Sequence, residues 1–280
     1  MDTHSIQQLF RQLRRQLKDL PCSPDPREIH RLRGRIRQVQ VILANSPEIS
    51  GKWVESLAAV RKAAGRVRDL DVFLENLQTL PQSSGSNSLT QLQSRLRKSR
   101  KRSIRSLEKA LDRHRKPTRK ALSGLARQVQ ITSTHSTSST GQSNSRILAS
   151  KAHQNITRLR KEIAQWPEPD DENLHSLRKN VKTLRTLLQL MPDHDADEIK
   201  ILGTAAAHMG QWHDWQRLAS LACKRLDSSI DSALLRQIEF NEDLHLERAL
   251  EAAHALRLAH PRPVKATSDV IPFANRHRVA

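Results

Sequence analysis

The sequence predicts an all-α protein made of two antiparallel four-helix bundles that are related by pseudo-twofold symmetry. Three observations support this fold class. Apolar residues recur at helical spacing through nearly all of the 280 residues, and no segment alternates between apolar and polar residues as a strand does. One pattern appears at His30 and again at His175, 145 positions later. A Ser/Thr-rich stretch lies between the copies and divides the predicted helices into two groups of four, which short connections make antiparallel.

The first bundle is predicted over residues 1–130. Its first helix covers residues 3–20 and ends at Pro21, because proline cannot continue a helix. Asp25 suits the cap of a second helix, which begins with a proline and covers residues 26–45. The apolar residues of the first helix follow one stripe: Ile6, Leu9, Phe10, Leu13, Leu17 and Leu20.

Two longer helices complete this half. We expect one over residues 51–79 and another, strongly basic, over residues 89–127, with a Ser/Gly loop at 81–88 between them. Pro117 is a point at which the basic helix is expected to be interrupted. Its apolar side is marked by Leu92, Leu96, Leu107 and Leu111.

The second bundle is predicted over residues 146–260. Residues 131–145 read ITSTHSTSSTGQSNS and lack apolar periodicity, so we expect a flexible linker there. The residues from Pro261, 261–280, are expected to form a disordered tail. The four helices between them are one that ends at Pro167 and others at 170–190, 196–226 and 229–258.

The duplicated pattern places a cationic stripe on one side of a helix. Its copies read HRLRGRIR at residues 30–37 and HSLRKNVK at residues 175–182. In each, a histidine, an arginine and a further cation occupy positions i, i+3 and i+7, which share one helical face. Two equivalent stripes indicate a site built from both halves. The apolar residues lie on the other side of each helix: Leu32, Ile36, Val39 and Leu43, and Leu177, Val181, Leu184 and Leu188.

The net charge favours a polyanionic partner. Lys and Arg number 48 against 29 Asp and Glu, which leaves +19 and favours nucleic acid, polyphosphate or anionic lipid headgroups. Residues 1–130 hold 28 of these cations and 11 of the acids, so the first half dominates long-range attraction. Aromatic residues amount to only 3%, with no Tyr, whereas proteins that bind single-stranded nucleic acid stack bases on aromatic side chains.

Phosphate is the ligand that suits the two stripes, since guanidinium groups bind it through forked hydrogen bonds and lysine offers a compact charge. The principal candidates for binding are His30, Arg33, Arg37, His175, Arg178 and Lys182. For the other basic helical positions, a solvated outer surface is the competing interpretation. These secondary candidates are Arg14, Arg15, Arg160, Lys161, Arg68, Arg95, Lys98 and Arg102.

Catalysis and metal binding have no visible machinery. The chain contains no HExxH, glycine-rich phosphate loop, nucleophile elbow or dense carboxylate cluster, so we expect a protein that is not an enzyme and uses no cofactor. His208 and His213 lie on different faces of their helix, which excludes the usual metal-ligand geometry. Asp69 and Asp214, related by the same offset, are expected to form structural ion pairs with neighbouring cations.

Cysteine content and hydropathy predict a cytoplasmic protein. Cys22 and Cys223 form no CxxC motif, and no signal peptide is visible, which is typical of a reduced compartment. No apolar run reaches the roughly 18 to 20 residues of a membrane-spanning helix, so no membrane partner is expected.

At this point the chain resembles the CHAD family, the conserved-histidine α-helical domains. DPREIHRLRGRIRQVQ and PDDENLHSLRKNVKTLR are similar to the family's paired HxLR…R/K signatures, and GRVRDLDVFLENL to its GxxRDxDV element. The second copy of that element has become GQWHDWQRL. The resemblance covers residues 3–258 and implies two four-helix bundles around a basic central pore that binds inorganic polyphosphate.

The resemblance also bears on partners. Family members often accompany a triphosphate-hydrolysing domain with an ExExK motif, which this chain lacks, so it is similar to stand-alone members and any catalysis would require another chain. The implied partners are polyphosphate and a polyphosphate-metabolising enzyme, with association to polyphosphate granules. A basic helical protein that binds nucleic acid, and a scaffold that targets granules or a phosphohydrolase, remain the alternatives.

Overall fold

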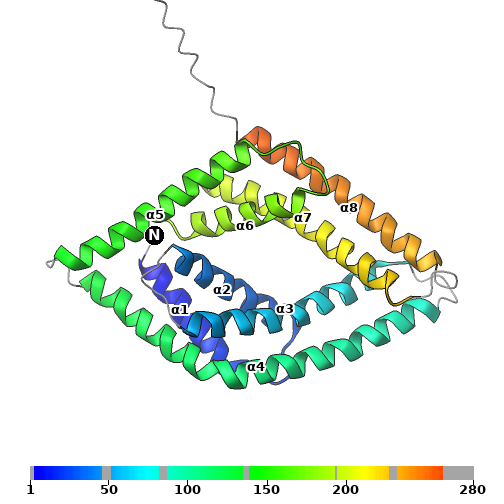
Figure 1. The fold of residues 1–280 in the computed structure, drawn as a ribbon, viewed down its shortest axis with the longest axis horizontal. Coiled ribbons are helices and arrows are strands. Elements are labelled where there is room, and N and C mark those ends of the chain that lie inside the picture. The colour runs from blue at the N-terminus through cyan, green and yellow to red at the C-terminus, as the bar shows by residue number, and fades with distance from the viewer. Residues whose placement is uncertain are drawn as a thin grey trace, which may run out of the picture.

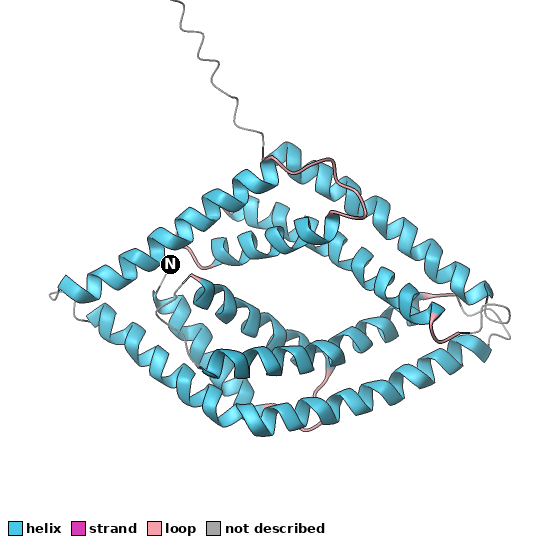
Figure 2. Ribbon diagram, in the orientation of Figure 1, coloured by secondary structure: helices cyan, strands magenta, loops and turns pink. Residues whose placement is uncertain are grey.

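The computed structural model describes residues 3–45, 52–81, 87–134, 139–192, 194–226 and 232–260, and every regular element in these ranges is a helix. The all-α prediction is therefore confirmed (Figures 1 and 2). The helices, in chain order, are α1 (Thr3–Asp19), α2 (Pro26–Ala44), α3 (Lys52–Thr79), α4 (Asn87–Thr134), α5 (Ser139–Ala164), α6 (Leu174–Gln189), α7 (Ala196–Cys223) and α8 (Ser232–Ala259).

Local sequence explains where α2 and α7 begin. Asp25 caps α2, where its side chain accepts a hydrogen bond from the backbone N–H of Glu28, and Glu28 accepts one from Asp25 in return. With Pro26 at the first helical position, three signals agree on this boundary. Asp195 similarly caps α7 by accepting from the N–H groups of Asp197 and Glu198.

The helices form a closed, diamond-shaped frame. Figure 1 shows α4, α5 and α8 along its outside, with α2, α3, α6 and α7 within it. Helices α1–α4 pack against one another, as do α5–α8, and the two sets meet where α2 contacts α6, α3 contacts α7 and α4 contacts α5. The two central helices that carry the duplicated pattern, α2 and α6, are therefore neighbours.

The apolar core has three parts, one of which both halves share. One cluster belongs almost entirely to α1–α4, and a second almost entirely to α5–α8. The third joins the end of α3 and the start of α4 to the end of α7 and the start of α8, with Phe73, Leu96, Trp215 and Leu218 among its members. The core is thus not divided between two separate bundles, and the pseudo-twofold relation stays a prediction.

The structure differs from the prediction of an irregular linker. Of residues 131–145, those that the structure describes are helical, because α4 continues to Thr134 and α5 begins at Ser139. Serine and threonine lower helix propensity by only fractions of a kcal/mol each, and this stretch contains no proline and a single glycine. The predicted tail at 261–280 lies outside the described residues.

Helix α4 is continuous through Pro117, although an interruption was expected there. Its ribbon changes direction part-way along in Figure 1. Proline removes one backbone hydrogen bond and bends a helix, so Pro117 accounts for this change. The same helix packs on both α3 and α1, with a hydrogen bond between His114 and Ser56 and another from Arg14 to Ser123. No helix in the described part of the chain is long and apolar enough to cross a membrane.

The shared cluster generates a prediction for stability. Leu218 is fully buried between α7 and its neighbours. We expect Leu218→Ala to lower the free energy of unfolding by about 2 to 5 kcal/mol, because it leaves a cavity in this cluster. Urea denaturation measures the change. Ile201→Ala, at a position 40% exposed, is the control and should cost under about 1 kcal/mol. Equal effects of the two substitutions would contradict the shared core.

Candidate functional site

The two copies of the duplicated pattern lie on α2 and α6, with their apolar sides inside the core. All eight predicted apolar positions are buried, from Leu32 to Leu43 on α2 and from Leu177 to Leu188 on α6. Burying each such side chain contributes about 1.5 to 3 kcal/mol, which fixes the rotation of both helices. The cationic sides must then point away from the core, toward the space between the two halves.

Two cavities, each of about 620 Å³, occupy that space. The first, which we call the α7 cavity, is lined by α2, α3, α6 and α7. The second, the α5 cavity, is lined by α2, α3, α5 and α6. Four cations line both cavities: Arg37, Arg61, Arg178 and Lys182. The two spaces therefore adjoin at a cluster to which both halves contribute.

All six principal candidates line one cavity or both. His30 and Arg33 lie in the α7 cavity and His175 in the α5 cavity, while Arg37, Arg178 and Lys182 lie in both. The two cationic ridges thus face a common region. Of the secondary candidates, Arg68 lines the α7 cavity.

The remaining secondary candidates line neither cavity. Helices α1, α4 and α5 turn their apolar sides inward, which leaves the cations of their opposite sides exposed. Three of them have partners there: Arg14 donates to Ser123, Arg95 to the carbonyl of Arg225, and Arg160 to both carboxylate oxygens of Glu198. The residues outside the cavities are Arg14, Arg15, Arg160, Lys161, Arg95, Lys98 and Arg102.

Several cavity residues were missed by the sequence analysis. The search for repeated cations could not find Arg61 or Arg217, because the positions 145 residues away are Ala206 and Val72. Neither arginine has a cation at the equivalent position of the other half, so a search for duplicated cations misses both. The pattern of buried residues in α3 and α7 shows which side of each helix faces the space between the halves, and this pattern could have identified them. The other missed cations are Lys62, Arg158 and Lys179.

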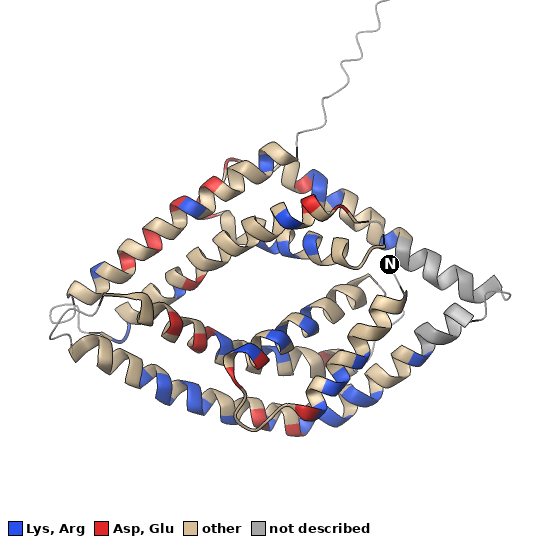
Figure 3. Ribbon diagram, turned by 180° about the vertical axis from the view of Figure 1, so that it is seen from behind, with Lys and Arg blue, Asp and Glu red and all other residues tan. Residues whose placement is uncertain are grey.

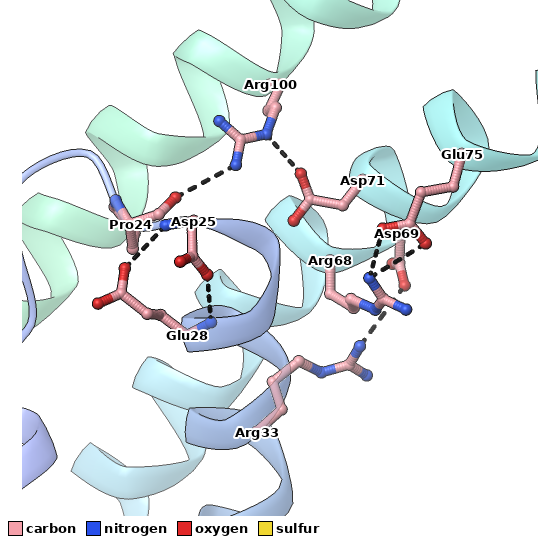
Figure 4. A network of polar contacts seen from close by, with 9 residues as sticks. All are labelled: Pro24, Asp25, Glu28, Arg33, Arg68, Asp69, Asp71, Glu75 and Arg100. Atoms are coloured by element: carbon pink, nitrogen blue, oxygen red, sulfur yellow. Dashed lines mark hydrogen bonds and ion pairs between the residues drawn. The ribbon is translucent and has the colours of Figure 1, made fainter. Parts of the chain in front are cut away.

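Asp69 links the two halves through ion pairs. Its carboxylate on α3 lies 3.9 Å from Arg33 on α2 and 2.8 Å from Arg217 on α7. Arg68, the preceding residue, forms an ion pair with Glu75, seven residues later on the same helix, at 3.2 Å (Figure 4). The expectation of a structural ion pair is confirmed for Asp69. For Asp214, burial raises the pKa against the opposing effect of Arg178 and Lys182, and no ion pair to it is described.

A second polar network holds the start of α2 against α3 and α4. Arg100 on α4 donates to the buried carboxylate of Asp71 on α3 and, at 3.2 Å, to the carbonyl of Pro24 (Figure 4). Burial raises the pKa of Asp71, an effect that the hydrogen bond from Arg100 opposes. Because Pro24 immediately precedes the cap of α2, this network positions His30 and Arg33 one and two turns into that helix.

The cavities disfavour the charged forms of their own cations. Burial is the main cause that lowers the pKa of Lys182 to about 7, and the charges of Arg178 and Arg37 add to it. Burial also lowers the pKa of His30, with Arg68 next in effect, and of His175, with Lys179 next. The pKa values of Arg33, Arg37 and Arg178 are lowered by burial as well.

His213 occupies the position equivalent to Arg68 and behaves as a neutral group. Its pKa is lowered to about 4, first by burial and then by Arg178 and His175. Its ring lies 4.7 Å from that of His175, centroid to centroid. His213 Nδ1 and Arg178 Nε are buried without a hydrogen-bond partner in the described structure. Buried polar atoms ordinarily have partners, so these two nitrogens carry a desolvation cost that no hydrogen bond in the described structure offsets.

The charge balance of the lining residues defines the chemistry. The α7 cavity has eight Lys and Arg against two Asp, and the α5 cavity has six Lys and Arg and no Asp or Glu among its described lining residues. Within the described part of the chain, no group of three or more His, Cys, Asp or Glu could hold a metal ion. The arrangement suits an anion with several charges, since one small anion would neutralise only part of it.

Comparison with known proteins identifies the family. The model of the CHAD domain matches residues 4–223, which include both copies of the duplicated pattern and the elements around Asp69 and Asp214. The chain belongs to the CHAD family. The resemblance seen in the sequence is thereby confirmed. A comparison of this CHAD protein with curated proteins gives no significant match.

The CHAD fold is also supported by a solved structure. The chain is similar to the crystal structure of the CHAD domain from the plant Ricinus communis, with a TM-score of 0.61 and 16% sequence identity. The alignment covers 92% of this chain and 89% of the plant chain. At this identity the likeness establishes the fold and leaves the ligand open.

The pKa of Lys182 generates a prediction for stability against pH. Its pKa of about 7 in the folded protein lies below the ordinary lysine value of 10.5, so the unfolded state holds more protons between these pH values. The free energy of unfolding of the unliganded protein therefore rises with pH in this window, by up to about 1.4 kcal/mol per pH unit.

Lys182→Met removes this titration. The variant should be more stable than the wild type at pH 7, and its advantage should shrink as the pH rises toward 10. Denaturant unfolding of both proteins at several pH values measures the difference. An advantage that stays constant from pH 7 to 10 would contradict a neutralised, buried Lys182.

Proposed function

We propose that this CHAD protein binds inorganic polyphosphate, without catalysing a reaction on it, in a basic pore made by the α7 cavity and the α5 cavity. The observation that carries the proposal is the set of four cations that line both cavities: Arg37, Arg61, Arg178 and Lys182. A chain of phosphates that passes from one cavity to the other contacts all four. In this proposal the halves are related by a pseudo-twofold axis, and each supplies one ridge.

The energetics of the empty cavities support an anionic ligand. Burial disfavours the charged forms of Arg33, Arg37, Arg178 and Lys182, and each also repels others of the set. A phosphate among them replaces the lost hydration with charge-assisted hydrogen bonds and removes the repulsion. The favourable change is larger than for cations on an open surface, where water already screens the charges.

The composition of the lining favours polyphosphate over nucleic acid. No Phe, Trp or Tyr occurs among the described lining residues of either cavity, so bases have no platform on which to stack. Polyphosphate has no bases and needs only cations and N–H donors. CHAD family membership supports the same ligand.

Charge reversal of one arginine on each ridge tests the proposal. We expect Arg33→Glu/Arg178→Glu to weaken polyphosphate binding by at least about 100-fold, because each substitution removes a charge-assisted contact worth about 1.5 to 3 kcal/mol. Fluorescence or calorimetric titration with chains of defined length measures the affinity. The wild-type affinity should also fall with log salt at a slope of about −0.7 per phosphate neutralised.

Arg15→Glu/Lys161→Glu is the matched control for this experiment. It changes the net charge by the same amount at exposed positions outside both cavities. Equal loss of affinity in the two double variants would assign binding to the general charge of the protein and reject the pore.

A steric substitution tests the same site without changing its charge. Gly65 lines the α7 cavity, and a Cβ added there meets no atom within 4 Å. Gly65→Leu should therefore fold normally, project into the cavity and lower polyphosphate affinity by about 10-fold or more. Gly124→Leu is the control, because that position on α4 is equally open but lies outside both cavities.

Thermal unfolding verifies that both leucine variants are folded. Leucine also has a higher helix propensity than glycine, so neither helix is weakened. Unchanged affinity in folded Gly65→Leu would show that polyphosphate does not enter the α7 cavity.

The location and partners of a polyphosphate-binding protein follow from where its ligand is found. We place it in the cytoplasm where polyphosphate accumulates, including polyphosphate granules, and with a polyphosphate-metabolising enzyme as a partner. Pull-down in the presence and absence of an added polyphosphatase distinguishes direct protein contacts from those bridged by the polymer.

A further inference from the structure

Helix α4 carries a straight row of exposed cations that belongs to neither cavity. The members, which we call the α4 row, recur at intervals of three and four residues before Pro117. At about 100° per residue they fall within one narrow strip, and they extend over about 27 Å of the helix. The α4 row consists of Arg95, Lys98, Arg102, Arg105, Lys109 and Arg113, all of them exposed.

The row faces away from the cavities. The other side of α4 packs against the core through residues such as Leu96 and Leu107, and Arg100 on that side points to Asp71. Seen from behind in Figure 3, Lys and Arg recur along α4, at the lower edge of the frame. The row is therefore a separate surface of the molecule.

The charges of the row lack acidic partners. No ion pair described in the structure includes any of its members, and the only polar contact described for them joins Arg95 to the carbonyl of Arg225. Helix α8, on the opposite edge of the frame, carries five acids, whereas α4 carries two, Glu108 and Asp112 (Figure 3). Aligned cations that outnumber their counter-charges repel one another, and a linear polyanion relieves that repulsion.

We propose that the α4 row is a second polyanion site, which binds a linear polyphosphate chain outside the cavities. This inference rests on the proposed function, because it assigns the same ligand to a further surface. It also assigns a role to exposed cations that the cavities leave unexplained, including Arg95, Lys98 and Arg102.

The shape of the row favours a flexible chain of phosphates. A nucleic-acid duplex presents its phosphates on two helical strands, so a straight row meets each strand only where the strand crosses it. Single-stranded nucleic acid requires stacking residues, and the described part of α4 contains no aromatic residue other than His114. A helix that lies in a membrane interface also buries apolar side chains there, and no large apolar residue of described α4 is exposed. Polyphosphate requires only the charges.

Two sites on one protein make binding depend on chain length. A long chain held in the cavities reaches the row as an intramolecular event, at a high effective concentration. Tripolyphosphate is too short to occupy both. The row should therefore add affinity for long chains and none for tripolyphosphate.

The test compares three variants with the wild type, each titrated with tripolyphosphate, long-chain polyphosphate and duplex DNA at several salt concentrations. The row variant is Arg102→Glu/Arg105→Glu/Lys109→Glu. The surface control, Arg15→Glu/Lys18→Glu/Lys161→Glu, has the same net charge at exposed positions on α1 and α5. The cavity variant is Arg33→Glu/Arg178→Glu.

We expect the row variant to bind tripolyphosphate like the surface control and to bind long chains about 10-fold more weakly than that control. Its salt slope for long chains should be shallower by about 2, because about three phosphates are no longer neutralised. Calorimetry should also show fewer phosphate units bound per protein. The cavity variant should lose affinity for both chains.

Three other outcomes would each reject a different part of these proposals. If the row variant and the surface control bind long chains equally, the second site is rejected and the proposed function stands. If the wild type binds neither chain, both proposals fail. If the row variant loses only its binding of duplex DNA and keeps that of long polyphosphate, the row serves nucleic acid and the inference is overturned.

Discussion

Repulsion among the cations that line the two cavities is the constraint on which the rest of this structure depends. Arg37, Arg61, Arg178 and Lys182 come from three helices and both halves of the chain, yet they line the same two cavities. Two unit charges 7 Å apart repel by about 2.4 kcal/mol at an effective dielectric constant of 20. Burial, to which the charges of Arg178 and Arg37 add, lowers the pKa of Lys182 to about 7, so the neutral form of this lysine is favoured in part. The remaining cost is what a polyanion can remove.

The fold supplies the stability that holds these charges together. The apolar sides of α2 and α6 are fully engaged in two core clusters, so neither helix can rotate its cations into solvent. The third cluster, around Phe73 and Trp215, joins the halves at one end of the frame. Asp69 adds a polar link, since it pairs with Arg33 on its own side and Arg217 on the other. Unfavourable charges at the centre are thus balanced by apolar packing around them.

The same residue types serve different purposes at different depths. In the cavities, burial shifts the pKa values of Lys182 and His30. On the outside of α4, cations such as Arg102 and Arg105 are exposed to solvent, which screens their charges. An inner contact with phosphate is therefore stronger and more selective, whereas an outer contact is weaker and more sensitive to salt.

The sequence by itself determined the helical class, the duplicated cationic stripes and the family. These are local properties: the spacing of Leu32 and Ile36 sets which side of α2 is buried, so the direction of Arg33 and Arg37 follows without any knowledge of neighbours. Only the tertiary structure decided which other cations join them. Arg61 and Arg217 enter the site, whereas Arg15 and Lys161 lie outside it, because helix packing and not residue type determines what faces the space between the halves. The third core cluster depends equally on long-range packing, because its members come from α3, α4, α7 and α8.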